Sequence, residues 1–345
     1  MLENILSQRK LPSLLSKDEM LDILLKEEYG YLPAKPEKLT FEETENFIPY
    51  FCAGKAISRK IVATATINGK DFSFPFHASI PKKEGKIPFF VLINFRDNVP
   101  DMYFPTEEIM DEGFAVLSFC YKDVTSDDGD FTNGLSGILY PDGKRNPTDA
   151  GKIAMWAWAA QRVMDYAQTL DCLDMNTSIV CGHSRLGKTA LLTGATDERF
   201  KFVYSNDSGC SGAAITRDKV GETVKIITTV FPYWFCENYL KYVDNEHNMP
   251  FDQHYLVACS APRYVYVASA IEDEWADPAS EMLSCVAASD IYNSYEKKGF
   301  ICENRLPLPG DEYHEGSIGY HVRSGIHYFS REDWQKVIKF VKKHS

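Results

Sequence analysis

The octapeptide Cys181–Lys188 (CGHSRLGK) places a serine between two glycines where an apolar run meets a helical segment. Ser178–Gly182 (SIVCG) has the composition of a buried strand, and residues 186–195 have that of a helix. A tight turn between strand and helix lifts a serine hydroxyl above the sheet edge, and the N–H groups at the helix start can stabilise an oxyanion. The spacing therefore predicts Ser184 as a nucleophile, with the Arg185 N–H directed at the oxyanion.

The match to a nucleophile motif is incomplete, because the usual motif has glycine two residues after serine, whereas here Leu186 holds that position and the glycine is Gly187. Two other interpretations fit the same residues. Residues 182–189 (GHSRLGKT) also match a phosphate-binding loop, for which Asp207 would end the acidic partner strand. In the third interpretation, Ser184 only caps a helix. A serine hydrolase additionally requires a histidine base and an acid, so the rest of the chain must distinguish these readings.

The base is expected in the loop between the last strand and the last helix, because hydrolases with this elbow follow the chain order serine, acid, histidine. His327 lies there, between the predicted strand Ser317–Arg323 and a helix, Arg331–Lys343, that Ser330 caps. His321 falls inside that strand and His314 lies in an acidic turn, and both remain alternative bases. We predict His327 as the base.

Two places offer the acid that orients the imidazole. Asp207 follows the apolar run Phe202–Ser205, and the acidic residues 272–274, with Asp277, follow the run Tyr264–Ala270. The loop after the later strand is the usual source in this class of hydrolase, and Asp273 is its central acid. Asp207 and Asp273 are both candidates.

Alternation of apolar runs with helical segments predicts the elements that position these residues. The runs Ile87–Asn94 and Phe114–Cys120, like the three after them, suit strands buried on both faces of a parallel sheet. Residues 59–80 alternate about Asn68-Gly69, which predicts an antiparallel edge hairpin. Further helices are expected at Lys17–Glu28 and at residues 149–169, the latter capped by Thr148 or Asp149.

These elements predict a doubly wound, mostly parallel α/β sheet of the α/β-hydrolase type. We expect one domain over residues 1–345, with residues 1–58 as a largely helical arm packed on the body. Residues 217–256 are expected to form a helical lid or insertion. Its aromatic residues, Phe231, Tyr233, Trp234 and Phe235, either line a sugar site or pack within the lid.

Composition limits the partners of the protein. The net charge of −12 and a pI near 5.2 argue against nucleic acid or an anionic membrane as the main partner. No apolar run approaches the roughly 18 residues of a membrane span. The nine cysteines are scattered without Cys-x-x-Cys, and the N-terminus lacks the features of a secretory signal, so we expect reduced thiols and a cytoplasmic location. No metal or organic cofactor is implied.

At this point the sequence resembles the glucuronoyl esterases of carbohydrate esterase family 15, whose bacterial relatives are often labelled acetyl xylan esterases. The family elbow reads G-C-S-R-x-G-K, and Gly182, Ser184, Arg185, Gly187 and Lys188 match it. Further matches are spread from residue 85 to residue 343: Leu92–Phe95, Ser205–Ala214, Pro250–His254, Ala261–Arg263 and Trp275–Pro278. The position of Gly187 is therefore a family trait, and the phosphate-loop interpretation loses its support.

The resemblance implies roles for named residues. Ser184 would be the nucleophile, His327 the base, and Arg185 an oxyanion support through its backbone and its guanidinium. Lys188 would bind sugar hydroxyls, and Trp275 would stack on or hydrogen-bond the substrate. Asp207 stands where many members have a glutamate, while other members use an acid after the next strand, as Asp273 is here.

The expected reaction is two-step acyl transfer on a small or oligosaccharide ester, with the Phe95 N–H as a second oxyanion donor. Glucuronoyl and acetyl esters are the leading bonds. Three alternatives remain: an amidase or peptidase, another small-ester hydrolase, and a non-catalytic binding protein on the same fold. The sequence does not indicate an oligomeric state.

Overall fold

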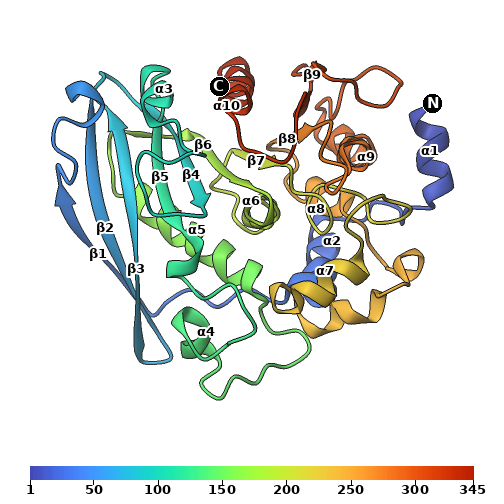
Figure 1. Cartoon of the computed structure of the whole chain (residues 1–345), viewed down its shortest axis with the longest axis horizontal. Helices are drawn as coiled ribbons and strands as arrows, with labels where there is room; N and C mark the ends of the chain where they lie inside the picture. Colours follow the sequence, from blue (N-terminus) through green and yellow to red (C-terminus); the bar gives the residue numbers. More distant parts are fainter.

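A computed structural model describes residues 1–345 and places all ten strands in one sheet (Figure 1). Their order is β1-β2-β3-β5-β4-β6-β7-β8-β10-β9, and the six strands from β5 to β10 in that order are parallel. The strands span Lys38–Glu45 (β1), Ala56–Ile67 (β2), Lys70–Pro81 (β3), Ile87–Asn94 (β4), Ala115–Cys120 (β5), Leu173–His183 (β6), Phe202–Asn206 (β7), Tyr264–Ala270 (β8), Glu312–Tyr313 (β9) and Ile318–Arg323 (β10). The predicted doubly wound α/β fold is confirmed.

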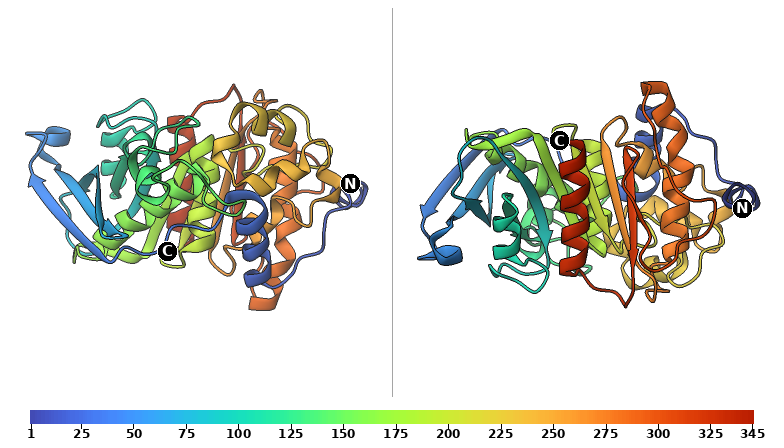
Figure 2. Two further views of the ribbon diagram at one scale, coloured as in Figure 1. Left: turned by 90° about the horizontal axis from the view of Figure 1, so that it is seen from below. Right: turned by 90° about the horizontal axis from the view of Figure 1, so that it is seen from above.

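Helices cover both faces of this sheet, as the two views of Figure 2 show. The helices span Leu2–Arg9 (α1), Lys17–Leu24 (α2), Thr106–Asp111 (α3), Gly134–Leu139 (α4), Lys152–Ala167 (α5), Arg185–Thr196 (α6), Val224–Val230 (α7), His254–Ala258 (α8), Pro278–Ala288 (α9) and Arg331–His344 (α10). Alternate residues of the central strands pack into two cores. Val91 and Val203 face the larger core with α5 and α6, whereas Phe90 and Tyr204 face the smaller one with α3 and α10. None of the helices is long and apolar enough to cross a membrane.

The edge of the sheet differs from the sequence-based expectation. The predicted hairpin is present as β2 and β3, joined at Asn68-Gly69, but a third antiparallel strand, β1, lies outside it. β1 falls within residues 1–58, which we expected to be largely helical. Its sequence, KLTFEETE, is mostly exposed and highly charged, so it lacks the apolar run by which the buried strands were recognised.

Helix α5 begins later than predicted. Its N-cap is Gly151, not Thr148 or Asp149. The carboxylate of Asp149 is already used in a local turn, where it accepts hydrogen bonds from the N–H and the side-chain amide of Asn146 (2.6 and 3.1 Å). The Gly151 N–H donates to Tyr29 O (2.9 Å), so the helix starts where the N-terminal arm meets the body.

The N-terminal arm packs on the body through a buried carboxyl group. After α2 the chain forms a single π-helical turn, Leu25–Tyr29, in which Glu28 is fully buried. The side-chain amide of Gln253 donates to both oxygens of this carboxyl group (3.0 and 3.2 Å). Burial raises the pKa of Glu28 to about 8, because its charged form has lost its water.

Replacing Glu28 with glutamine is expected to flatten the pH dependence of stability. The folded state holds the proton up to about pH 8, whereas the unfolded chain releases it near pH 4.5. This carboxyl group therefore lowers the wild-type free energy of unfolding as the pH rises from 5 to 8, by about 3 kcal/mol. Urea denaturation at both pH values measures the effect, with exposed Glu84→Gln as control. An equal slope in wild type and Glu28→Gln would contradict the prediction.

Candidate active site

Ser184 occupies a strained turn between β6 and α6. Its backbone has φ 58° and ψ −128°, a conformation that a residue with a side chain rarely adopts. The side chain of Ser184 does not cap α6, and the residue is only half-buried. A partly exposed hydroxyl on a strained turn at the start of a helix is the geometry of a nucleophile elbow, and it disfavours the interpretation of Ser184 as a cap.

The two glycines of the motif let the chain fold this tightly. A Cβ on Gly182 would lie 2.2 Å from Leu186 O, inside the turn itself. A Cβ on Gly187 would lie 3.0 Å from the Ser205 side chain of β7 and equally close to Ser208. Leu186 points into the core and is fully buried. A side chain at 187, where α6 crosses β7, would therefore be crowded, whereas Leu186 has room in the core.

The base and one of the acids form a close pair at the same edge of the sheet. His327 lies in the loop between β10 and α10, and its Nδ1 donates to Asp273 Oδ2 at 2.5 Å. Burial would raise the pKa of Asp273, but the hydrogen bond from His327 and its charge outweigh this and hold the pKa below its usual value. With Asp273 ionised, Nδ1 carries the proton and Nε2 is left to accept one.

A second histidine, which the sequence analysis did not single out, supports the first. The ring of His183 packs against that of His327, with 4.4 Å between centroids. Its Nδ1 lies 2.6 Å from Asn206 Oδ1. Burial and the neighbouring His327 lower the pKa of His183 to about 3, so its ring is neutral. The only available signal was its place directly before the nucleophile.

Asp207 lies nearby but is bonded differently. It is almost fully buried at the end of β7, with φ 44°. One of its oxygens accepts from the Ala270 N–H (2.8 Å) and the other lies 3.6 Å from the guanidinium of Arg323. Burial raises the pKa of Asp207 well above its usual value. The structure thus brings both predicted acids to one place, and only Asp273 is hydrogen-bonded to His327.

One group of donor atoms here has the spacing of a metal site. An oxygen of Asp207, an oxygen of Asp273 and a ring nitrogen of His327 all lie within 4.8 Å of one another. The guanidinium of Arg323 already supplies a positive charge beside Asp207, and His327 Nδ1 is engaged by Asp273. The arrangement therefore fits a proton-transfer pair better than a cation site.

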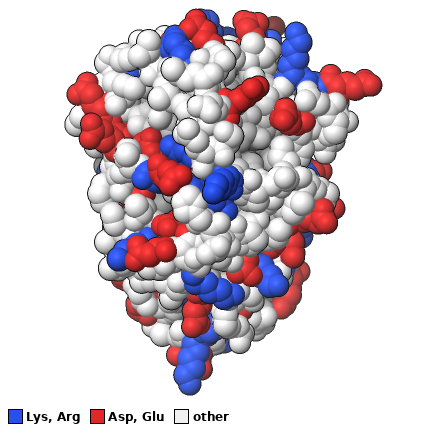
Figure 3. All heavy atoms as spheres, turned by 90° about the vertical axis from the view of Figure 1, so that its right-hand side faces the viewer, with Lys and Arg blue, Asp and Glu red and all other residues white.

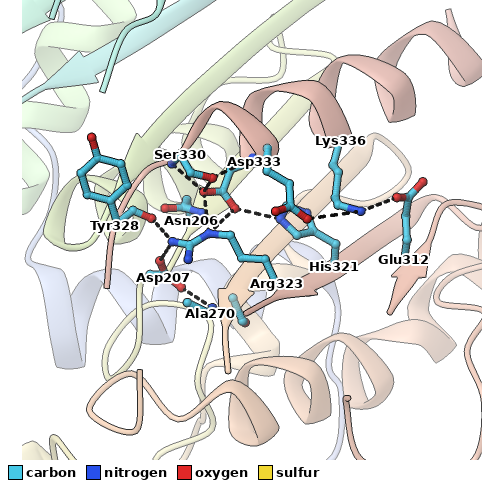
Figure 4. Close-up of polar contacts among 12 residues, drawn as sticks. Asn206, Asp207, Ala270, Glu312, His321, Arg323, Tyr328, Ser330, Asp333 and Lys336 are labelled. Carbon is cyan, nitrogen blue, oxygen red and sulfur yellow. Dashed lines mark hydrogen bonds and ion pairs between the residues drawn. The ribbon is translucent and has the colours of Figure 1, made fainter. Parts of the chain in front are cut away.

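The other two histidines considered as bases, His314 and His321, are buried, and Figure 4 shows His321 beside Asp333. The Tyr266 hydroxyl lies between them, 2.7 Å from His314 Nε2 and 2.9 Å from His321 Nδ1. His321 Nε2 lies 2.9 Å from Asp333. Both imidazoles are thus engaged in an internal network, away from the elbow.

The guanidinium of Arg185 is fixed beside the nucleophile. It pairs with Asp127, which also accepts from the Tyr121 hydroxyl (2.8 Å) and the Trp234 indole N–H (2.7 Å). Its centre lies 4.5 Å from the Trp234 ring and 5.2 Å from the Phe231 ring. These aromatic residues of the 217–256 segment, which otherwise forms α7 and three short 3-10 turns, therefore hold Arg185.

Three residues predicted to bind substrate have different surroundings. The Phe95 N–H is taken by Asn94 Oδ1 (2.9 Å), so we no longer assign it to the oxyanion. The ammonium of Lys188 is buried and donates to Ser208 O (2.5 Å) and Cys210 O (2.7 Å). These bonds hold the loop after β7. The Lys188 ammonium, which we expected to contact sugar hydroxyls, is therefore engaged by backbone carbonyls. Trp275 is half-exposed, two residues after Asp273 in the same loop.

Comparison with known proteins agrees with this geometry. Residues 63–296 match the family described as glucuronyl esterase of fungi. Carbohydrate esterase MZ0003, from an unknown prokaryotic organism, is 39% identical over 240 residues, which are 69% of this chain and 55% of that protein. The chain spans about half the length of the curated relatives it matches.

Solved structures match over nearly the whole chain. A promiscuous CE15 esterase from a marine bacterial metagenome has 31% identity and a TM-score of 0.86, covering 95% of this chain and 91% of its own. The glucuronoyl esterase from Solibacter usitatus has 31% identity and a TM-score of 0.85, covering 94% and 91%. The strained serine, the glycines that permit it and the matched residues 63–296 lead to one conclusion: this chain is a member of the glucuronyl esterase family.

Proposed function

We propose that this protein is a serine hydrolase of sugar esters, with glucuronoyl esters as its first substrates. The observation that carries the proposal is the His327–Asp273 pair, 2.5 Å apart, at the sheet edge where Ser184 forms the elbow. Several relatives that match this chain are named 4-O-methyl-glucuronoyl methylesterases, which supports the choice of ester.

The residues suit a two-step acyl transfer. His327 Nε2 takes the Ser184 proton as the hydroxyl oxygen attacks the ester carbonyl, and Asp273 stabilises the imidazolium that forms. The negative carbonyl oxygen is stabilised by the Arg185 N–H at the start of α6 and by the adjacent guanidinium. His327 then gives its proton to the leaving alkoxide. In the second step the same histidine activates water, which releases the acid and restores Ser184.

A cavity beside the His327 loop suits the leaving alcohol. It has a volume of about 1260 Å³, and its lining includes Met102, Arg323, Ser324 and Tyr328. Because His327 protonates the departing oxygen, the alcohol leaves on the side of the site that this histidine faces. We therefore place the alcohol part of the ester towards this cavity and the acid part towards Arg185 and Trp275.

We also propose a cytosolic location and a soluble substrate. All nine cysteines are free thiols, and most are buried, which suits a reducing compartment. Acidic and basic side chains are interspersed on the face that carries α1 and α9 (Figure 3), and the net charge is −12. Imported oligosaccharides or another small ester fit this setting better than a cell-wall polymer. Acetylated xylo-oligosaccharides are the second substrate class that we propose to test.

A hydrolysis panel tests the proposed substrate. Purified protein is given benzyl glucuronate, methyl glucuronate, acetylated xylo-oligosaccharides, p-nitrophenyl acetate and a peptide amide, and kcat/KM is measured for each. We expect the glucuronate esters to have the highest values. Acetyl esters as the best substrates would keep the mechanism and overturn the assigned ester. Cleavage of the amide alone would identify an amidase, and silence on every substrate would favour a binding protein.

A further inference from the structure

The loop that carries His327 is held from beneath by one buried guanidinium (Figure 4). Arg323 is the last residue of β10, and its side chain turns back under residues 324–328. One terminal nitrogen, Nη1, donates to Ser324 O (3.0 Å). The other, Nη2, donates to Ile326 O (3.2 Å) and to Tyr328 O. The two carbonyls that flank His327 are therefore bonded to the same nitrogen atom.

Two acidic side chains from other elements flank this guanidinium in turn. Its Nε donates to both oxygens of Asp333 (3.1 and 3.0 Å), near the start of α10. Asp333 is itself fixed by the N–H and hydroxyl of Ser330 (both 2.7 Å) and by His321 (2.9 Å). Asp207, from the end of β7, lies 3.6 Å away on the other side. Both acidic side chains are buried, and the hydrogen bonds and charges of His321 and Arg323 hold the pKa of Asp333 below its usual value, so this carboxylate balances Arg323 without water.

Little else holds the middle of this loop. Glu272 exchanges hydrogen bonds with Gly325, through its N–H and its carboxylate (both 3.0 Å), which ties the start of the loop to β8. Beyond that point the loop is open: Ile326 is 66% exposed, and the His327 side chain is 40% exposed. The imidazole must still stay within hydrogen-bonding reach of both Ser184 and Asp273 for proton transfer.

We propose that Arg323 is a positioning residue for His327, held in place by the Asp333 carboxylate. This inference rests on the proposed function, because it assumes that His327 is the base. Displacing a catalytic group by about 1 Å can cost about 10²-fold in rate. Loss of Arg323 would free the carbonyls of Ile326 and Tyr328 and let the imidazole move. Arg323 also borders the cavity proposed for the alcohol, so its role in positioning His327 is measured from kcat and from the mobility of the loop.

The test compares Arg323→Met with a matched control, Arg263→Met. Arg263 is also a buried arginine that donates to three backbone carbonyls: Gly194 (2.7 Å), Phe200 (2.9 Å) and Asp197 (3.2 Å). It lies before β8, at the opposite edge of the sheet from His327. Both variants should lose stability in urea denaturation. We expect only Arg323→Met to lose kcat, by about 10²-fold, and to show faster amide hydrogen exchange over residues 325–329.

Equal kcat values in folded Arg323→Met and wild type would overturn the proposal, as would an equal loss of kcat in Arg263→Met. If Arg323→Met does not fold, Arg323→Lys takes its place, because lysine keeps the charge but cannot reach carbonyls on both sides of His327. It should lose about tenfold in kcat, and wild-type kcat would count against the proposal. Wild-type activity that depends on Ser184 is measured in parallel, so a failure here is distinct from a failure of the proposed function.

Discussion

Ser184→Ala is expected to remove ester hydrolysis almost completely, with a loss of at least about 10⁴-fold in kcat, since removing the nucleophile from a triad disables it as a unit. The hydroxyl is partly exposed and does not cap α6, so its loss leaves no buried group without a partner. The variant should fold as well as the wild type, or slightly better. Initial rates on the best ester of the panel measure the loss.

Two controls accompany this variant. Ser178→Ala removes a hydroxyl in the middle of β6, where it donates to Arg199 O (2.7 Å), and should leave kcat unchanged. An organophosphonate should label the wild type at Ser184 and leave Ser184→Ala unlabelled. A Ser184→Ala variant that keeps a tenth of the wild-type rate would show that another group performs the attack.

Asp273→Asn is expected to lower kcat by about 10³- to 10⁴-fold. The change is nearly isosteric, so the loop should keep its shape. The asparagine amide can donate to His327 Nδ1, and that hydrogen bond favours the tautomer with the proton on Nε2. A histidine in this tautomer has no lone pair facing Ser184. The variant also lacks the negative charge of Asp273, which stabilises the imidazolium in the wild type.

Asp207→Asn is the matched comparison, because Asp207 lies in the same cluster of donor atoms without a hydrogen bond to His327. Asparagine still accepts from the Ala270 N–H, so we expect less than a tenfold loss of kcat. Steady-state kinetics on both variants separate the roles. A larger loss of kcat in Asp207→Asn than in Asp273→Asn would show that Asp207, and not Asp273, is the acid that acts on His327.

Much of this site could be predicted because its positions follow from chain order. A strand that is buried on both faces must be an unbroken apolar run, so β4 to β8 were visible in the sequence. Their carboxyl ends lie at one edge of the sheet, which brings Ser184 and the residues after β8 and β10 together. Strand β1 was missed because its exposed, charged residues carry no such pattern.

The choice between the two acids could not be made from the sequence. It depends on how far a carboxylate reaches, and Asp207 and Asp273 both follow parallel strands of the same sheet. The Ala270 N–H and Arg323 hold Asp207, whereas Asp273 remains available to His327. Similarly, the sequence predicted that Lys188 would be near the site, but not that backbone carbonyls of the loop after β7 would take up its ammonium.

The glycines of the elbow have a consequence for how this protein could diversify. No side chain can be added at Gly182 without collision with backbone atoms of the same turn, and a Cβ on Gly187 would be crowded by Ser205 and Ser208. A single substitution at Gly182 therefore cannot reshape the turn that carries Ser184. In the loop after β4 and the loop after β8, exposed side chains such as Met102 and Trp275 are under no such restriction. New substrates would therefore be acquired by drift in these loops, around a reaction centre that stays unchanged.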